Sequence, residues 1–127
     1  MSKASRNKGQ RGEREVCKLL AEKLGGEFKR NLMQTAEGGY DVIGLEGCAL
    51  EVKRCETLSI NSWWDQAKEQ AEVNTWPVLF YRKSRQPWSV VIEIGMANKQ
   101  PTTSFGHDRM TVDVDTFIKI YKWRSVG

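Results

Sequence analysis

Apolar residues recur at helical spacing near the start of the chain. Val16, Leu20 and Leu24 stand at positions i, i+4 and i+8, which places them on one face of a helix. A Gly-Gly pair follows directly, and glycine commonly ends helices. We therefore predict a helix over residues 8–24, preceded by a flexible basic arm over residues 1–7.

Shorter apolar runs, separated by turn residues, predict the strands. Two such runs flank Glu46-Gly47, a pattern typical of a β-hairpin. The compact run over residues 77–81 is typical of a strand in the middle of a sheet. The expected strands are residues 27–32, the two arms of a hairpin within residues 40–53, and residues 77–81, 88–94 and 110–114.

Helical patterns return after the hairpin and at the C-terminus. We expect one helix over residues 63–74, where Ser62 and Asp65 resemble a capping box, and a last helix from residue 115. Residues 33–39 and 95–109 follow neither period and are expected to be irregular. This order of elements predicts one mixed α/β domain over residues 1–127, in which helices flank a mixed central sheet.

The composition is that of a soluble globular protein. The chain has 127 residues, of which 39% are hydrophobic and 28% charged, enough to bury one ordinary core. No apolar run approaches the roughly 18 residues that a membrane span requires. The N-terminal residues are polar and do not resemble a signal peptide. We expect a cytoplasmic protein with no membrane partner.

Cysteine and histidine usage restricts the kinds of metal site. The three cysteines form no C-x-x-C pair, and His107 is the only histidine. Reduced thiols are the favoured interpretation, with a zinc site or a disulfide as the alternative. A metal bound by this chain would therefore have oxygen ligands, which favours Mg²⁺ or Mn²⁺.

Positive charge is concentrated in a few places. The net charge is +4 and the pI is about 9.1. Lys8, Arg11 and Arg14 belong to a basic N-terminal segment, and Arg30 and Arg54 each follow a lysine. Clustered Lys and Arg indicate nucleic-acid binding, although simple solvated surface charge is the alternative.

Three polar residues of the hairpin are candidates for one site. Glu51 and Lys53 share a face because alternate residues of a strand point to the same side. A strict two-residue turn at Glu46-Gly47 would place Asp41 on the opposite face from Glu51. The acids converge only if the loop holds three residues, or if a bulge interrupts the strand, with Gly44 as the candidate position.

Glu13 is a fourth candidate because of its position on the first helix. It lies three residues before Val16 and seven before Leu20, so it projects from the apolar face. A carboxylate directed at a core costs several kcal/mol unless it is paired or holds a metal. Two interpretations stay open: Glu13 belongs to the same site as the hairpin acids, or it reaches solvent or a nearby arginine from a frayed first turn.

Two carboxylates beside a lysine suit phosphodiester hydrolysis. Asp41 and Glu51 would hold one or two Mg²⁺ ions, with the backbone carbonyl of Val52 as a further ligand. Lys53 would orient the attacking water and stabilise developing negative charge. Glu13 would add a carboxylate to the metal site, directly or indirectly.

Several motifs in order resemble one nuclease superfamily. Gly-Tyr-Asp41, followed after nine residues by Glu51-Val-Lys53, resembles the PD-(D/E)xK signature. The segment Asn-Lys-Gly-Gln-Arg-Gly-Glu13-Arg14-Glu-Val is similar to the first helix of archaeal-type Holliday-junction resolvases and their phage relatives. Trp64-Asp-Gln66-Ala67-Lys-Glu-Gln-Ala71 resembles small phage endonucleases of that group. The sequence departs from the signature at Tyr40, where proline is usual.

The resemblance implies a restriction-endonuclease-like fold and assigns roles to single residues. It implies metal ligands at Asp41 and Glu51, a catalytic lysine at Lys53 and an acidic helper at Glu13. It also implies DNA contacts at Arg14 and Arg30, and a glutamine near the site at Gln66. A homodimer is implied as well, since a four-way junction requires paired cuts on opposing strands.

The leading hypothesis is a Mg²⁺-dependent, structure-selective DNA endonuclease in which Mn²⁺ can substitute. It would act as a dimeric Holliday-junction resolvase on branched or double-stranded DNA, in the cytoplasm of a prokaryotic host with a phage as a candidate source. Two alternatives stay open: a general or restriction-type nuclease of the same fold, and a non-catalytic DNA-binding module in which the acids pair with Lys53 and Arg54.

Overall fold

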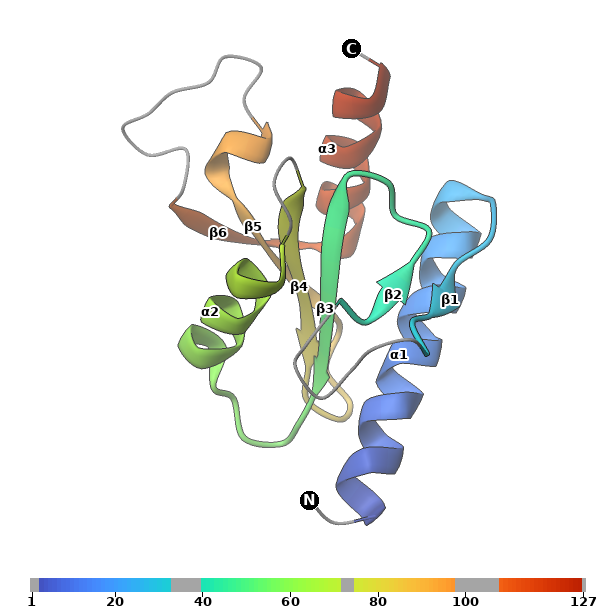
Figure 1. Ribbon diagram of the computed structural model, residues 1–127, viewed down its shortest axis with the longest axis vertical. Helices are drawn as coiled ribbons and strands as arrows, with labels where there is room; N and C mark the ends of the chain where they lie inside the picture. The colour runs from blue at the N-terminus through green and yellow to red at the C-terminus, as the bar shows by residue number, and fades with distance from the viewer. Residues whose placement is uncertain (1–2, 33–39, 72–74, 98–107, 127) are drawn as a thin grey trace.

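A six-stranded sheet forms the centre of the molecule (Figure 1). The computed structural model describes residues 3–32, 40–71, 75–97 and 108–126. The strands are β1 (Lys29–Arg30), β2 (Val42–Ile43), β3 (Cys48–Arg54), β4 (Trp76–Arg82), β5 (Ser89–Glu93) and β6 (Arg109–Asp113). The helices are α1 (Lys3–Leu24), α2 (Ile60–Gln70), the short 3₁₀ helix η1 (Ile94–Ala97) and α3 (Val114–Val126). The predicted fold, a mixed sheet flanked by helices, is confirmed.

The strands lie in the sheet in the same order as in the chain. All neighbours are antiparallel except β3 and β4, which are parallel. Parallel neighbours need a crossover connection, and α2 supplies it. The prediction that residues 77–81 form an interior strand is confirmed, because β4 is bonded to β3 on one side and to β5 on the other.

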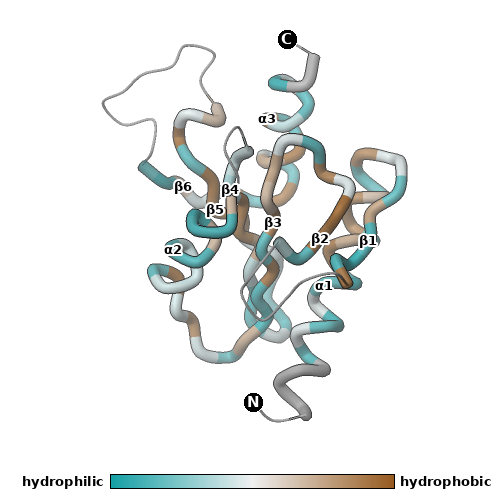
Figure 2. Tube along the Cα trace, in the orientation of Figure 1, coloured by the Kyte–Doolittle hydropathy of each residue, from teal (hydrophilic) through white to brown (hydrophobic). Residues whose placement is uncertain are grey.

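Both faces of the central strands are buried, and Figure 2 shows the hydropathy of the residues along them. On one face, α1 and α3 cover a large core that includes Leu20, Leu50, Phe80 and Phe117. On the other face, α2 packs Trp63, Trp64 and Ala67 against Leu79 and Val91. Since side chains alternate along a strand, β3 presents Leu50 and Val52 to the first core. Ala49, Glu51 and Lys53 consequently lie on the α2 side.

The hairpin register meets the condition set by the sequence. Val42 pairs with Leu50, so paired residue numbers sum to an even value and the loop is not a strict two-residue turn. The amide N–H of Cys48 donates to the carbonyl oxygen of Leu45 at 3.2 Å. Asp41 and Glu51 are therefore directed to the same face, as the hypothesis of a shared site requires.

Gly44 permits this loop geometry. Its φ of +122° lies in a region that residues with a side chain rarely adopt. A Cβ atom at this position would lie 2.6 Å from the carbonyl oxygen of Glu27, a separation too short for any carbon side chain. The irregularity predicted at Gly44 is thus present, and the segment preceding β1 packs closely against it.

The N-terminal arm requires a correction. Helix α1 begins at Lys3 and not near residue 8, so most of residues 1–7 are helical. Lys, Ala and Arg are good helix formers, and no glycine occurs before Gly9. The apolar period begins only at Val16, so it carries no information about the turns before it.

Other element ends also differ from the predicted ones. Helix α2 begins after the N-cap residue Ser59, which makes no side-chain capping bond, so the capping box at Ser62 is wrong. Strand β1 is shorter than residues 27–32 because its partner β2 is itself only two residues long. The irregular segment 95–109 opens with η1. Residues 33–39, 72–74 and 98–107 lie outside the described part of the chain.

Candidate active site

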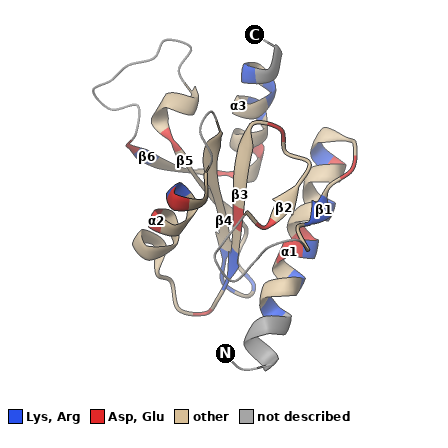
Figure 3. Ribbon diagram, viewed as in Figure 1, with Lys and Arg blue, Asp and Glu red and all other residues tan. Residues whose placement is uncertain are grey.

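Two buried carboxylates face each other across the β2–β3 hairpin. Asp41 lies opposite Glu51 because the adjacent residues Val42 and Leu50 are paired. Asp41 is 8% exposed and Glu51 is 2% exposed, and their side chains are hydrogen-bonded. Figure 3 shows an acidic position on β3, with basic residues at the end of the same strand. Two acids buried together in this way are costly unless a cation or a proton is present.

The Asp41 side chain takes the place of a backbone acceptor beside β3. Its Oδ2 atom accepts a hydrogen bond from the backbone N–H of Val52 at 2.7 Å. The N–H of Asp41 donates to the carbonyl oxygen of Leu50 at 2.7 Å, and its own carbonyl oxygen accepts from the N–H of Asn31 at 2.8 Å. These bonds fix the Asp41 carboxylate immediately before the start of β2, with Oδ2 bonded to the backbone of β3.

Glu51 has a strongly perturbed proton affinity. Burial, together with the negative charges of Asp41 and Glu13, raises the pKa of the Glu51 carboxyl to about 8, although Lys53 lowers it. At neutral pH and without a cation, Glu51 therefore holds a proton. A divalent cation between the carboxylates would displace that proton and compensate the repulsion.

Lys53 completes the hairpin group on the same face of β3. Its Nζ atom lies 3.8 Å from Oε2 of Glu51, and its side chain is 25% exposed, compared with 3% for that of Glu51. The lysine therefore lies between the buried acids and solvent. In the neighbouring strand Tyr81 is paired with Lys53, a proximity that the sequence did not reveal because the two residues belong to separate strands.

Glu13 reaches the site from α1 but is already paired. Its Oε1 atom accepts a hydrogen bond from Nε of Arg30 at 2.9 Å, and the two side chains are 17% and 24% exposed. Arg30 lies on β1, so the partner is neither solvent nor a residue of the same helix. The carboxylate still contributes to the raised pKa of Glu51. Glu13 therefore belongs to the electrostatic environment of the acids.

Asp41 and Glu51 are suitable oxygen donors for a hard divalent cation. Within the described residues, no three His, Cys, Asp or Glu side chains are arranged to hold one ion, and Glu13 is engaged by Arg30. Mg²⁺ commonly keeps several waters and binds one or two carboxylates together with substrate phosphates. Two acids therefore fit such an ion, and the metal roles of Asp41, Glu51, Glu13 and the Val52 carbonyl stay predictions.

The predicted DNA-binding residues do not all lie on one surface. Arg11 and Arg14 are exposed on α1. Lys8 lies on the same helix and pairs with Glu56 at 3.1 Å. Gln66 is half-buried on α2, the helix that covers the Glu51 side of the sheet. Arg11 and Arg14 are therefore open to a DNA ligand, whereas Lys8 is paired and Gln66 is half-buried.

Arg54, one of the predicted DNA contacts, is part of an ion-pair group, and its contact with DNA stays a prediction. It lies on the face of β3 opposite Lys53, and its side chain is only 10% exposed. Its Nη1 atom is 3.6 Å from Oε1 of Glu15, and the same carboxylate binds Nη2 of Arg82 at 3.0 Å. Sequence reasoning missed this group, since Glu15 and Arg82 are far apart in the chain. Arg54 holds α1 to the sheet and is poorly placed for a phosphate.

A family comparison agrees with this arrangement. Residues 4–125 match the model of a family described as "Phage putative PDDEXK endonuclease". The match spans nearly the whole chain and includes all four candidate catalytic residues. The chain belongs to this phage PDDEXK endonuclease family. The resemblance inferred from the motifs is confirmed, and the protein is an endonuclease of this class.

A solved structure shares the fold of this phage-type PDDEXK endonuclease. The chain is similar to Hjc of Archaeoglobus fulgidus, described as a Holliday-junction resolvase from an archaeal hyperthermophile. The two chains are 17% identical, the TM-score is 0.50, and the similarity covers 91% of this chain and 93% of Hjc. No curated protein matches the chain. At this identity the likeness establishes the restriction-endonuclease-like fold alone.

Proposed function

We propose that the protein is a divalent-metal-dependent endonuclease that cuts branched DNA as a Holliday-junction resolvase, with Mg²⁺ as its metal. The observation that carries the proposal is the convergence of Asp41, Glu51 and Lys53 on one face of the hairpin. The likeness to Hjc supports a branched substrate, because Hjc is itself a Holliday-junction resolvase.

The two carboxylates place the reacting phosphate. When bound, Mg²⁺ supplies Lewis acidity toward the phosphate and lowers the pKa of water. The Oδ2 atom of Asp41 accepts from the Val52 N–H, which restrains the carboxylate beside β3. Glu51 releases its proton when the cation binds, which makes metal loading depend on pH.

Lys53 acts on the solvent side of the acids. Its ammonium group orients the attacking water and stabilises the negative charge that develops on the phosphate oxygens. Glu13 acts through Arg30 and Glu51, as a positioning residue whose charge holds Arg30 beside the site.

Exposed basic residues of α1 would bind the phosphates of the DNA arms. Arg11 and Arg14 are exposed on this helix, Lys8 would join them on release from Glu56, and Arg30 is held by Glu13 of the same helix. Gln66 would approach the same substrate from α2. Such contacts set affinity without reading sequence.

We further propose a homodimer, since two cuts on opposing strands require two active sites held at a fixed distance. The activity would take place in the cytoplasm of a prokaryotic host, where phage DNA is present. Within the described residues, none of the helices is both long and apolar enough to cross a membrane. Sedimentation of the free and DNA-bound protein tests the dimer, and a monomeric complex would contradict it.

Cleavage of a four-way junction by the Asp41→Asn variant tests the proposal. We expect the rate in Mg²⁺ to fall by more than about 100-fold, because the amide loses the negative charge that the metal needs. Junction binding should be retained, because the amide oxygen can still accept from the Val52 N–H. The measurements are single-turnover cleavage and equilibrium binding in EDTA.

Asp65→Asn is a matched control, since Asp65 is an exposed acid on α2 whose carboxylate lies 3.6 Å from Nζ of Lys68 on the same helix. This variant should cut at the wild-type rate. The metal-nuclease proposal would be refuted if Asp41→Asn cut the junction at the wild-type rate. It would also be refuted if the wild-type protein cut the junction without metal. Equal rates on junction and linear duplex would restrict it to a general nuclease.

A further inference from the structure

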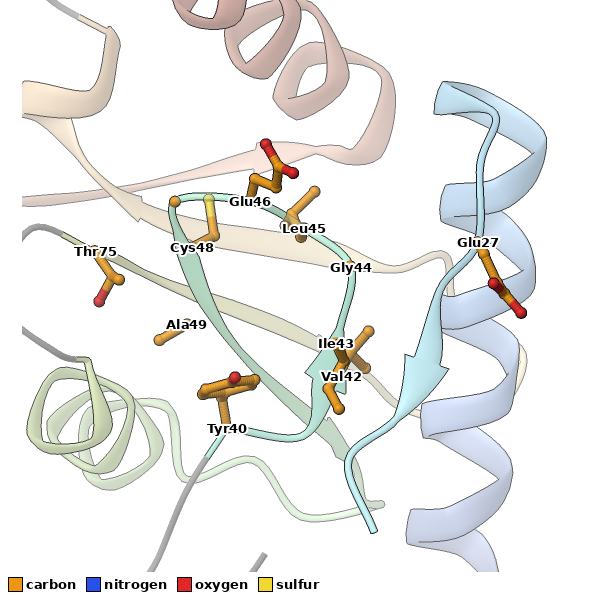
Figure 4. A pocket seen from close by; sticks show the side chains of 11 residues that line it. Glu27, Tyr40, Val42, Ile43, Gly44, Leu45, Glu46, Cys48, Ala49 and Thr75 are labelled. Atoms are coloured by element: carbon orange, nitrogen blue, oxygen red, sulfur yellow. The ribbon is translucent and has the colours of Figure 1, made fainter. Parts of the chain in front are cut away.

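A hollow of about 500 Å³ lies over the β2–β3 hairpin (Figure 4), and two of its lining residues, Tyr40 and Val42, flank Asp41 in the chain. Tyr40, Ala49 and Thr75 line the end nearer α2, and Glu27 lies at the other end. Ile43 forms part of the wall between them. Neither the catalytic proposal nor the phosphate contacts use this hollow.

The hollow begins one step from the site of cleavage. Ala49 precedes Glu51 by two residues on β3 and shares its face, which corresponds to about 6–7 Å along a strand. Tyr40 is bonded directly to Asp41. A DNA strand whose phosphate lies at the acids would therefore have an adjoining nucleotide within reach of the hollow.

The lining suits a flat, apolar ligand better than a phosphate. Ile43 is 44% exposed, which is unusual for isoleucine on a sheet, and Tyr40 offers an aromatic ring at the end nearer α2. Glu27 and Glu46 lie at the edge and would repel the negatively charged DNA backbone. The backbone is thus directed toward Lys53 and α1, and a base toward the hollow.

We propose that this hollow holds one unstacked nucleobase next to the cut phosphodiester bond, with Tyr40 stacking on its face. The inference rests on the proposed function and names the part of the substrate that the site selects. Extruding a base is least costly where pairing and stacking are already interrupted. A base at a branch point meets that condition, and a base within a continuous duplex does not. The hollow therefore selects DNA structure without reading sequence.

The test couples one side chain to one base. Four-way junctions are prepared with a single abasic nucleotide, placed in turn at each position around the cut. Cleavage in Mg²⁺ and binding in EDTA are measured for wild type, Tyr40→Ala, Tyr40→Phe and Trp123→Ala. Trp123, an aromatic residue on α3 that is 40% exposed, lies outside the hollow and is the matched control.

On the intact junction, we expect Tyr40→Ala to lose about 5- to 150-fold in cleavage efficiency, as for other base–aromatic contacts. Tyr40→Phe keeps the ring and should behave as wild type. At one position beside the cut, removing the base should abolish the difference between wild type and Tyr40→Ala, in both binding and cleavage. Trp123→Ala should show no such coupling at any position.

The inference is overturned if the loss in Tyr40→Ala is the same on intact and abasic junctions at every position, or if no loss occurs. Should Tyr40→Ala fail to fold, Ile43→Ser on the facing wall is measured in the same series with the same criteria. Failure of the proposed function gives a different result, namely no Mg²⁺-dependent cleavage of the junction by the wild-type protein.

Discussion

Replacing Glu51 with glutamine should abolish cleavage and, at neutral pH, stabilise the metal-free protein. Glutamine resembles the protonated form of this buried carboxyl, so it removes the charge that burial and Asp41 make unfavourable. The pKa of Glu51 is about 8 in the folded protein, compared with 4.5 for an ordinary glutamate. Folding therefore favours the protonated form of this residue.

The sign of the pH dependence follows from this difference. The folded wild-type protein binds more protons at Glu51 than the unfolded chain does between pH 4.5 and pH 8. Its free energy of unfolding consequently falls as pH rises through that window, by about 1.4 kcal/mol per pH unit. The stabilisation that the raised pKa of Glu51 gives the folded protein is fully present below pH 4.5. At pH 7 about 3 kcal/mol of that stabilisation has been lost.

The assay is urea unfolding in EDTA at several pH values between 4.5 and 8, for wild type, Glu51→Gln and Glu46→Gln. We expect the advantage of Glu51→Gln over wild type to grow with pH, and to reach about 3 kcal/mol near pH 7. Glu46 is an exposed acid of the same hairpin, so its variant should show no such trend. Taking differences between variants cancels the titration of the other carboxyls.

Metal should reverse the order of stability. A divalent cation binds the folded wild-type protein and stabilises it by mass action, while Glu51→Gln lacks one ligand. Since binding releases the Glu51 proton, wild-type affinity for Mg²⁺ should rise about tenfold per pH unit up to pH 8. A difference between variants that does not change with pH would refute the assignment of a raised pKa to Glu51.

Two further predictions concern the packing of α1 against the sheet. Gly12→Ala should destabilise the protein by about 1–3 kcal/mol, because the new Cβ would lie 3.1 Å from Cβ of Arg54. Gly9→Ala is the matched control: its Cβ would have no atom within 4 Å, so it should stabilise the protein by about 0.5–1 kcal/mol. Equal effects of the two variants in thermal unfolding would contradict this prediction. Glu15→Gln should cost about 1–3 kcal/mol, because Arg54 and Arg82 share its carboxylate, and unchanged stability would show that this ion-pair group is not needed.

Local patterns in the sequence determined much of the fold. The apolar period of α1 and the compact run of β4 each depend on neighbouring residues, and both elements are present. Strand alternation alone is enough to place Glu51 and Lys53 together on one face. The same reasoning failed at element ends, because α1 begins at Lys3, well before the apolar period starts at Val16.

Only the tertiary structure decided which charged residues meet. Sequence spacing showed that Asp41 and Glu51 converge in some hairpin registers and separate in others, and the Gly44 geometry selects the first. Arg54 has the sequence context of a DNA contact, but the fold places it beneath α1 with Glu15. The physical reason is common to both cases: strand register and ion pairing join residues distant in the chain, and local periodicity carries no information about such pairs.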